Sequence, residues 1–276
     1  MKFYNYALSH NLIGRYDKKW DLLILTTVPD FSASGLESEE SKPGINEILE
    51  TTSKLSVEIT TDFLASNFKS LLPMTSNDGT RPYLMGIYID SGASTLVATD
   101  GCILRTIKVD HIHQAQESVI IPSAAIKEAL KGNGKFLTLS KLERDYYSLS
   151  CGAIRVIFKP IAREYPRYQS IIPKTNLPHS AVLGCEAIKW IKDVCKVAKA
   201  DKVKIPIIKI SNGEMTAFDG KMHRFTPTSA DCPTVNFNAF LMADALQEGF
   251  LNISGELTIS MQEIGNITNL IMPVRG

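Results

Sequence analysis

The sequence ends in Asn269-Leu270-Ile271-Met272-Pro273-Val274-Arg275-Gly276, an apolar strand pattern that continues to the last residues. Chain ends usually fray, so we expect this segment to be held in a sheet or to line a pocket for another molecule. Two other segments belong with it: Ala98-Thr99-Asp100-Gly101, and the proline-flanked stretch from Tyr165 to Pro173. The three segments together indicate the fold.

Between residues 56 and 177, short apolar strands alternate with two short helices. Thr61-Asp62 is expected to cap the first helix. The apolar face of that helix is expected to comprise Phe63, Leu64, Phe68, Leu71 and Leu72. Pro122-Ser123 is expected to open the second helix and Gly132-Asn133-Gly134 to end it. Strands are predicted at 57–60, 84–89, 95–99, 104–109, 118–121, 136–139, 146–150 and 154–158.

Residues 178–276 repeat this order. Strands are predicted at 179–183, 205–210, 214–218, 222–226, 234–237, 251–254, 257–261 and 268–274, and helices at 185–199 and 239–246. Each half therefore contains a βαβββ unit twice, which predicts an α+β fold of two domains. Such duplicated units can stack into an array or close into a ring.

The first 55 residues differ from the rest in composition. Residues 20–28 form a strand pattern, whereas residues 32–44 collect serine, glycine, proline and the acidic Glu37, Glu39 and Glu40. We predict an N-terminal remnant hairpin with an acidic linker over residues 1–55. One domain is predicted over 56–177 and a second over 178–276.

With 276 residues and a 44% hydrophobic composition, the chain is long enough for two domains with their own cores. Its formal net charge of +1 argues against binding nucleic acid by bulk charge, so such a contact requires lysines gathered on one surface. No apolar run approaches the roughly 20 residues that span a bilayer. Five cysteines without close pairing favour reduced thiols. We therefore expect a soluble, cytoplasmic protein.

The predicted helix over 185–199 gathers lysines on one face. Lys189, Lys192, Lys196 and Lys199 follow at steps of three, four and three residues, which matches the helical period. The absence of glutamate at i+4 favours a surface that meets phosphate, although a solvated helix face is the alternative. Such binding is non-specific and salt-sensitive, because lysines read no base sequence. The other helices contribute Lys69, Lys127 and Lys131.

The segments at 98–101, 165–173 and 269–276 resemble, in the same order, three segments of the bacterial DNA sliding clamp, the β subunit of DNA polymerase III. The resemblance covers roughly residues 57–276, the second and third domains of that family. It implies a DNA-clamp fold with sheets outside and helices inside a ring that surrounds duplex DNA. It also implies that a DNA polymerase and a clamp loader bind through a short peptide motif, and that the lysines listed above face DNA.

In the family, the three segments meet between the two domains and line an apolar pocket for the partner peptide. Taken alone, Leu84, Leu104 and Ile171 are more often ordinary core residues. A groove lined by Met, Leu and Pro suits different apolar peptide anchors. Position by position, the resemblance implies a pocket of Leu84, Thr99, Gly101, Leu104, Pro166, Ile171, Leu270, Met272, Pro273 and Val274, with Arg275 at its rim. The family often has basic residues at the positions of Ile103 and Ser170, so this pocket is less polar.

Most of the family's first domain has no counterpart in this sequence, because residues 11–35 resemble only its last hairpin and connector. Family clamps close a dimer of three-domain subunits. A chain with two domains needs three subunits for the same ring, as in the eukaryotic clamp, the proliferating cell nuclear antigen. We therefore expect a trimer in which an edge of the domain beginning near Val57 pairs with an edge strand of a neighbour's C-terminal domain. The alternative is a shortened clamp paralogue, of mobile-element or phage type, that binds clamp-binding peptides without encircling DNA.

The sequence shows no catalytic pattern. His111-Ile112-His113 lacks the spaced ligand pairs of a zinc site, and Gly132-Asn133-Gly134-Lys135 lacks the P-loop spacing. Asp100-Gly101 and Asp219-Gly220 are interpreted as turns. Paired carboxylates, a serine elbow and a reactive-cysteine pattern do not stand out. We predict a binding protein with no catalytic residues, metal or cofactor.

Overall fold

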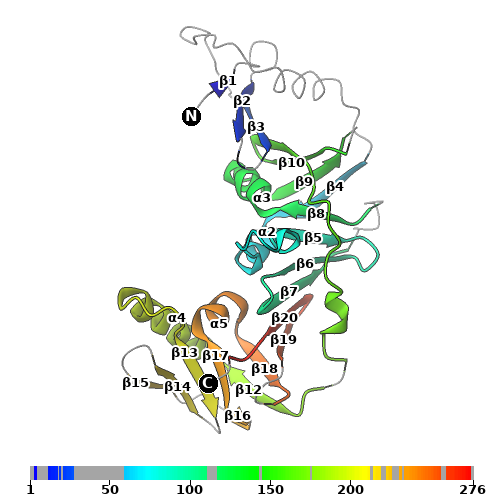
Figure 1. Ribbon diagram of the computed structural model, residues 1–276. Coiled ribbons are helices and arrows are strands. Elements are labelled where there is room, and N and C mark those ends of the chain that lie inside the picture. The colour runs from blue at the N-terminus through cyan, green and yellow to red at the C-terminus, as the bar shows by residue number, and fades with distance from the viewer. Residues whose placement is uncertain are drawn as a thin grey trace. The chain divides into compact units, whose positions relative to one another are not determined.

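The computed structural model describes residues 3–4, 12–17, 19, 21–27, 59–110, 117–142, 145–174, 176–211, 214–218, 222–225, 230–231, 233–255 and 259–274. They divide into two compact units (Figure 1). Unit 1 takes its residues from 1–95 and 110–164, and unit 2 from 96–109 and 165–276. The predicted division at residues 55 and 177 stays a prediction.

Unit 1 contains a seven-stranded antiparallel sheet in the order β1-β2-β3-β11-β10-β9-β4. Its strands are β1 (Phe3–Tyr4), β2 (Leu12–Asp17), β3 (Leu22–Thr27), β11 (Ile154–Phe158), β10 (Tyr147–Cys151), β9 (Phe136–Lys141) and β4 (Ile59–Leu64). The helix α3 (Ser123–Ala129) packs on β3, β10 and β11. The β2–β3 hairpin joins the sheet through β11, with Ile24 opposite Val156.

The predicted helix cap at Thr61-Asp62 is wrong. Strand β4 continues to Leu64, and the helix α2 (Ala65–Leu71) begins after it. Asp62 lies opposite Thr138 of β9, and the Thr138 hydroxyl donates to the Asp62 carboxylate. This cross-strand pairing keeps the Asp62 carboxylate on the sheet rather than at a helix start. Leu64, predicted on the helix face, is an exposed strand residue instead.

Unit 1 also contains a second strand pair, β5 (Gly86–Asp90) with β8 (Val119–Pro122). Gly86 lies opposite Pro122, and a Cβ atom there would be 2.5 Å from the Ile121 carbonyl oxygen. Short 3-10 turns occupy Leu72–Met74, Pro82–Leu84 and Leu130–Gly132. The last of these ends α3, as predicted from the glycines, and Asn133 follows it with a φ of 57°.

Unit 2 contains strands in the order β16-β12-β18-β19-β20-β7-β6. Their bounds are β16 (Ala230–Asp231), β12 (His179–Leu183), β18 (Gly249–Ile253), β19 (Ser260–Ile264), β20 (Ile267–Ile271), β7 (Ile103–Lys108) and β6 (Thr95–Thr99). A four-stranded sheet has the order β15 (Met222–Phe225), β14 (Glu214–Phe218), β13 (Ile207–Ser211) and β17 (Val235–Asn238). Helices α4 (Cys185–Ala200) and α5 (Ala239–Ala245) pack against each other (Figure 1).

The last predicted strand is too long, because β20 ends at Ile271. Pro273 has no N–H group for a ladder. Its neighbours instead bond to two different elements: the Met272 N–H donates to the Cys102 carbonyl (2.9 Å), and the Val274 N–H to that of Asn236 in β17 (2.7 Å). The segment Met272–Val274 is therefore tied to the turn before β7 and to the four-stranded sheet. Strand β19, at 260–264, also begins later than the predicted 257–261, and β16 was not predicted.

The two halves of the chain that the sequence predicts to be duplicated also share an equivalent backbone hydrogen bond. After β11, the Ile161 N–H donates to the carbonyl of Ile120 in β8 (3.0 Å). After β20, the Val274 N–H makes the corresponding bond to Asn236 in β17. Both strands end three residues before the donor, and a proline immediately precedes the donor in each case. The α+β fold is confirmed. No helix among the described residues is both long and apolar enough to cross a membrane.

Candidate functional site

The turn between β6 and β7 is held by its own side chains. The Asp100 carboxylate accepts hydrogen bonds from the backbone N–H groups of Cys102 (2.7 Å) and Ile103 (2.9 Å). The Thr99 hydroxyl donates to the Ile103 carbonyl and accepts from the Gly101 N–H (3.0 Å). Gly101 has a φ of 99°, which a residue with a Cβ rarely adopts. The turn therefore presents the Cys102 carbonyl in a defined place, where it accepts from Met272.

Three buried apolar residues form a row across β7, β20 and β19. Leu104 lies opposite Leu270, and Leu270 lies opposite Met261. Residues directly opposite one another share a face of the sheet. Leu104 and Leu270 are each 2% exposed and Met261 is 7% exposed. We call these three residues the apolar row.

Two of the four large apolar side chains exposed in the described part of this unit lie in the predicted pocket segments. Met272 follows Leu270 by two residues and is 45% exposed. Ile171, also 45% exposed, ends a 3-10 turn (Tyr168–Ser170) in the 165–173 segment. Tyr165 and Tyr168 of this segment are buried, whereas Pro166 and Ile171 are exposed. The unit therefore contains a buried apolar row together with accessible apolar side chains on two of the predicted segments, 165–173 and 269–276.

The lysine face of α4 is accessible. Lys189, Lys192, Lys196 and Lys199 are all exposed, while Ile191, Val194, Cys195 and Ala198 are buried on the other side. One lysine has an acidic partner that the i+4 pattern did not indicate: Lys196 Nζ lies 2.8 Å from Asp193 Oδ1. The hydrogen bond from Lys196 lowers the pKa of Asp193. Lys199 Nζ lies 5.6 Å from the centroid of the Phe240 ring on α5.

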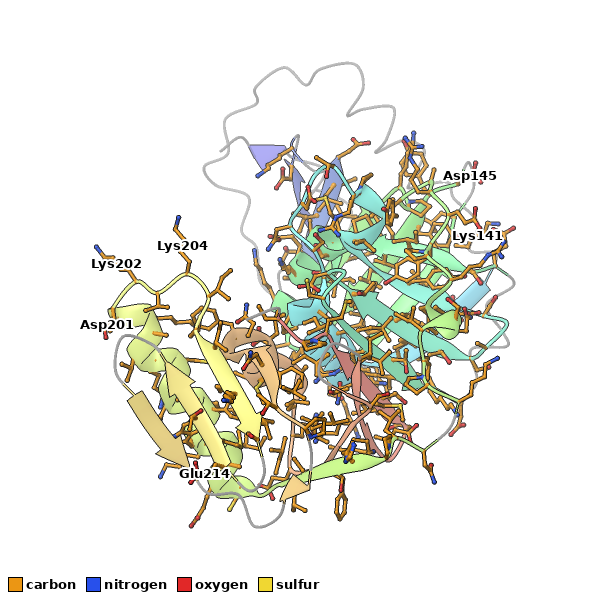
Figure 2. All side chains as sticks on the ribbon, turned by 60° about the horizontal axis from the view of Figure 1, so that its bottom comes forward. Lys141, Asp145, Asp201, Lys202, Lys204 and Glu214 are labelled. Carbon is orange, nitrogen blue, oxygen red and sulfur yellow. The ribbon has the colours of Figure 1, made fainter. Side chains whose placement is uncertain are left out.

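The basic surface of unit 2 extends beyond the predicted lysines. Lys202 and Lys204 follow α4, and Figure 2 shows both side chains reaching away from the ribbon. Lys202 has a φ of 56°, so the chain turns sharply there. Sequence reasoning ended the stripe with the helix, although the K-x-K spacing after it was visible.

In unit 1, Lys69 lies on α2, Lys127 lies on α3, and Lys131 lies in the 3-10 turn that follows α3. Lys69, Lys127 and Lys131 are exposed, and Lys69 and Lys127 lie in the last turns of their helices. Lys131 Nζ lies 2.5 Å from Glu128 Oε1. Exposed ion pairs of this kind contribute little to stability and exchange partners easily.

No protein-family model matches the sequence, and no curated protein matches it either. Solved structures do match, among them the Helicobacter pylori β clamp bound to a DNA ligase peptide, with a TM-score of 0.64 and 20% identity over 96% of this chain and 76% of that one. The chain has the sliding-clamp fold. The sliding clamp of Bartonella birtlesii bound to griselimycin matches with a TM-score of 0.62 and 19% identity, over 96% and 76% of the two chains. The polymerase III β subunit of Caulobacter crescentus matches with a TM-score of 0.62 and 19% identity, over 96% and 77%.

Within this clamp fold, hydrogen bonds and strand pairing join much of the predicted pocket. Thr99, Gly101 and Leu104 connect to Leu270 and Met272 through the turn and the β7–β20 pair. Pro166, Ile171, Pro273 and Val274 belong to the same unit. Leu84 is a buried residue of unit 1, and Arg275 lies outside the described residues.

Sequence reasoning missed Met261 as a member of the apolar row. The predicted strand over 257–261 placed this residue at a strand end, whereas it lies near the start of β19. Its position became visible only through its pairing with Leu270. In the described part of the clamp fold, no three His, Cys, Asp or Glu side chains gather to hold a metal ion. His111 and His113 lie outside that part.

Proposed function

We propose that the chain is a sliding-clamp-like processivity factor that surrounds duplex DNA and tethers a polymerase or another replication or repair protein. The observation that carries this proposal is the apolar row with the exposed Met272 beside it, in a chain that has the clamp fold. It acts by binding, in the cytoplasm, rather than as an enzyme.

The partner binds as a short peptide with apolar anchors. Ile171 and Met272 offer accessible apolar area, and flexible methionine side chains adapt to different anchors. The Helicobacter pylori β clamp was solved with a DNA ligase peptide, which supports a peptide site in this fold. The proposed site in unit 2 comprises Thr99, Gly101, Leu104, Pro166, Ile171, Leu270, Met272, Pro273 and Val274, with Met261 added by strand pairing. Leu84, which lies in unit 1, and Arg275, which lies outside the described residues, stay predictions from the family resemblance.

DNA is held by topology and by weak phosphate contacts. The exposed lysines of α2, α3 and α4 supply interchangeable charges without base recognition. Weak contacts of this kind permit sliding, and a tethered polymerase rebinds the primer end at a high effective concentration. Lys202 and Lys204, both exposed, add two positive charges directly after α4.

Ring closure uses strand edges of separate copies. In unit 1, β11 already pairs with β3, which leaves β1 and β4 as the edges of the seven-stranded sheet. In unit 2, the four-stranded sheet ends in β15 and β17. In a trimer, an edge strand of unit 1 in one copy pairs with an edge strand of unit 2 in the next copy at each of the three interfaces. Such head-to-tail contacts form a closed ring when the rotation between successive copies adds up to a full turn.

Native mass spectrometry at micromolar concentration tests the ring, and retention on nicked circular DNA compared with linear DNA tests encirclement. A trimer that stays on the circle and slides off the linear fragment supports the proposal. A monomer that still binds the DNA ligase peptide supports the shortened paralogue instead. A chain that binds neither peptide nor DNA contradicts both.

A further inference from the structure

A second cross-strand row lies one residue away from the apolar row. Arg105 follows Leu104 in β7, Asn269 precedes Leu270 in β20, and Gln262 follows Met261 in β19. Asn269 lies opposite Arg105 on one side and opposite Gln262 on the other. Successive residues of a strand point to opposite faces. The polar row therefore lies on the reverse face of the sheet, behind the apolar row.

Arg105 joins this polar row to the end of α5. Its Nε donates to Asn269 Oδ1 (2.6 Å), and its Nη2 donates to the carbonyls of Ala245 (2.7 Å) and Asp244 (3.2 Å). Helix α5 has no basic residue in its own last turn, so Arg105 supplies the positive charge that a helix C-terminus favours. Gln262 makes a second link, since its amide both accepts from and donates to the backbone of Gln247 (2.9 and 2.8 Å).

The guanidinium of Arg105 lies in the interior, where its removal would leave buried hydrogen-bond acceptors without their donor. The residue is 3% exposed, and burial lowers its pKa, while the charge of Asp244 acts in the opposite direction. An arginine keeps its proton at physiological pH and presents its donors in a fixed fork. Loss of this side chain leaves the Asn269 amide oxygen and two helix carbonyls without these donors in the interior.

We propose that Arg105 is a positioning residue for the partner-peptide site, which ties β7 and β20 to α5 and so fixes the Met272–Val274 segment against the Asp100 turn. The inference rests on the proposed function, since it concerns the same site. Arg105 touches no peptide: it acts from the reverse face of the sheet, through Leu104, Leu270 and the Met272 to Cys102 hydrogen bond.

The test combines two measurements on Arg105→Met and Arg105→Lys in the full chain. Fluorescence anisotropy follows binding of the labelled DNA ligase peptide from the Helicobacter pylori complex. Hydrogen exchange follows the Met272 amide, with the Val203 amide, which donates to Ala198 (2.9 Å), as the internal reference in unit 2. Arg155→Met is the control for loss of an arginine elsewhere in the chain, because Arg155 is an exposed residue of unit 1 whose Nη2 donates to the Ser148 hydroxyl.

We expect Arg105→Met to bind the peptide about tenfold more weakly and to exchange the Met272 amide about tenfold faster, with the Val203 amide changed less than twofold. Arg105→Lys, which keeps the charge but not the fork, falls between Arg105→Met and the unaltered protein. The Arg155→Met control stays within twofold in both measurements. A structural role alone would raise the exchange of both amides together, and that result overturns the inference.

The two hypotheses fail in different ways. If the unaltered protein does not bind the peptide, the proposed peptide site is wrong, yet selective release of the Met272 amide in Arg105→Met still supports the positioning role. If the unaltered protein binds and both Arg105 variants match it in affinity and in exchange, the positioning role is wrong. Should Arg105→Met fail to fold, Arg105→Lys carries the same comparison.

Discussion

Replacing Met272 with aspartate should weaken peptide binding while leaving the stability of the fold nearly unchanged. Met272 is 45% exposed, so a bound peptide has nearly half of the side chain left to cover. Full burial of a methionine contributes about 1.5–3 kcal/mol, and the exposed share is therefore worth about 0.7–1.4 kcal/mol. Desolvating a polar group without a partner adds about 1–3 kcal/mol. Met272→Asp should weaken the peptide by about 2–4 kcal/mol in total, or roughly 30- to 700-fold.

The assay is anisotropy with the labelled DNA ligase peptide, alongside thermal unfolding. Met272→Leu, which keeps volume and apolar character, is the control and should stay within about fivefold of the unaltered protein. The melting temperature of Met272→Asp should change little, because the residue is half exposed and its backbone hydrogen bond to Cys102 is retained. Peptide affinity within threefold for Met272→Asp would refute the placement of Met272 in the site.

Three further changes test the other parts of the structure. Lys189→Glu combined with Lys192→Glu should weaken DNA binding and reduce the steepness of the plot of log K against log salt by about 2, while peptide affinity stays unchanged. An unaltered slope would show that α4 does not contact DNA. Leu104→Ala should cost about 2–5 kcal/mol of unfolding free energy in urea, since the side chain is 2% exposed, and a cost under 1 kcal/mol would show that the apolar row is loosely packed. Gly132→Ala should destabilise unit 1 by at least about 2 kcal/mol, because its Cβ would lie 1.8 Å from the Cys151 carbonyl oxygen. Gly79→Ala, where a Cβ meets nothing within 4 Å, is the control and should stay within about 0.5 kcal/mol.

Local pattern predicted many elements correctly. The strands at 95–99, 154–158, 179–183 and 214–218 and the start of α4 at Cys185 match the structure. Their boundaries are marked by turn residues such as Asp100-Gly101 and Gly184, which act within a few residues of the chain. The amphipathic spacing of α4 also determined which side is buried, since 3.6 residues per turn leaves its lysines on the far side.

The errors fall where a distant segment competes with a local pattern. Thr61-Asp62 has the composition of a helix cap, but Thr138 on β9 takes the carboxylate as a cross-strand partner. Residues 272–274 continue an apolar strand pattern, but Cys102 and Asn236 accept their N–H groups instead of a ladder strand. In both places a hydrogen bond to a residue remote in sequence outweighs the propensity of the segment itself.

The sequence by itself determined the duplicated α+β order, the lysine face of α4 and the three segments from which the clamp resemblance was drawn, because periodicity and turn chemistry are properties of neighbouring residues. Only the tertiary structure decided that Met261 joins Leu104 and Leu270, and that Arg105 and Asn269 stand behind them against α5. The register of β7, β20 and β19 determines which residues join each of these two rows. A shift of one residue in register would exchange the apolar and polar rows between the two faces, and strand pairing across more than 150 residues is what chooses between them.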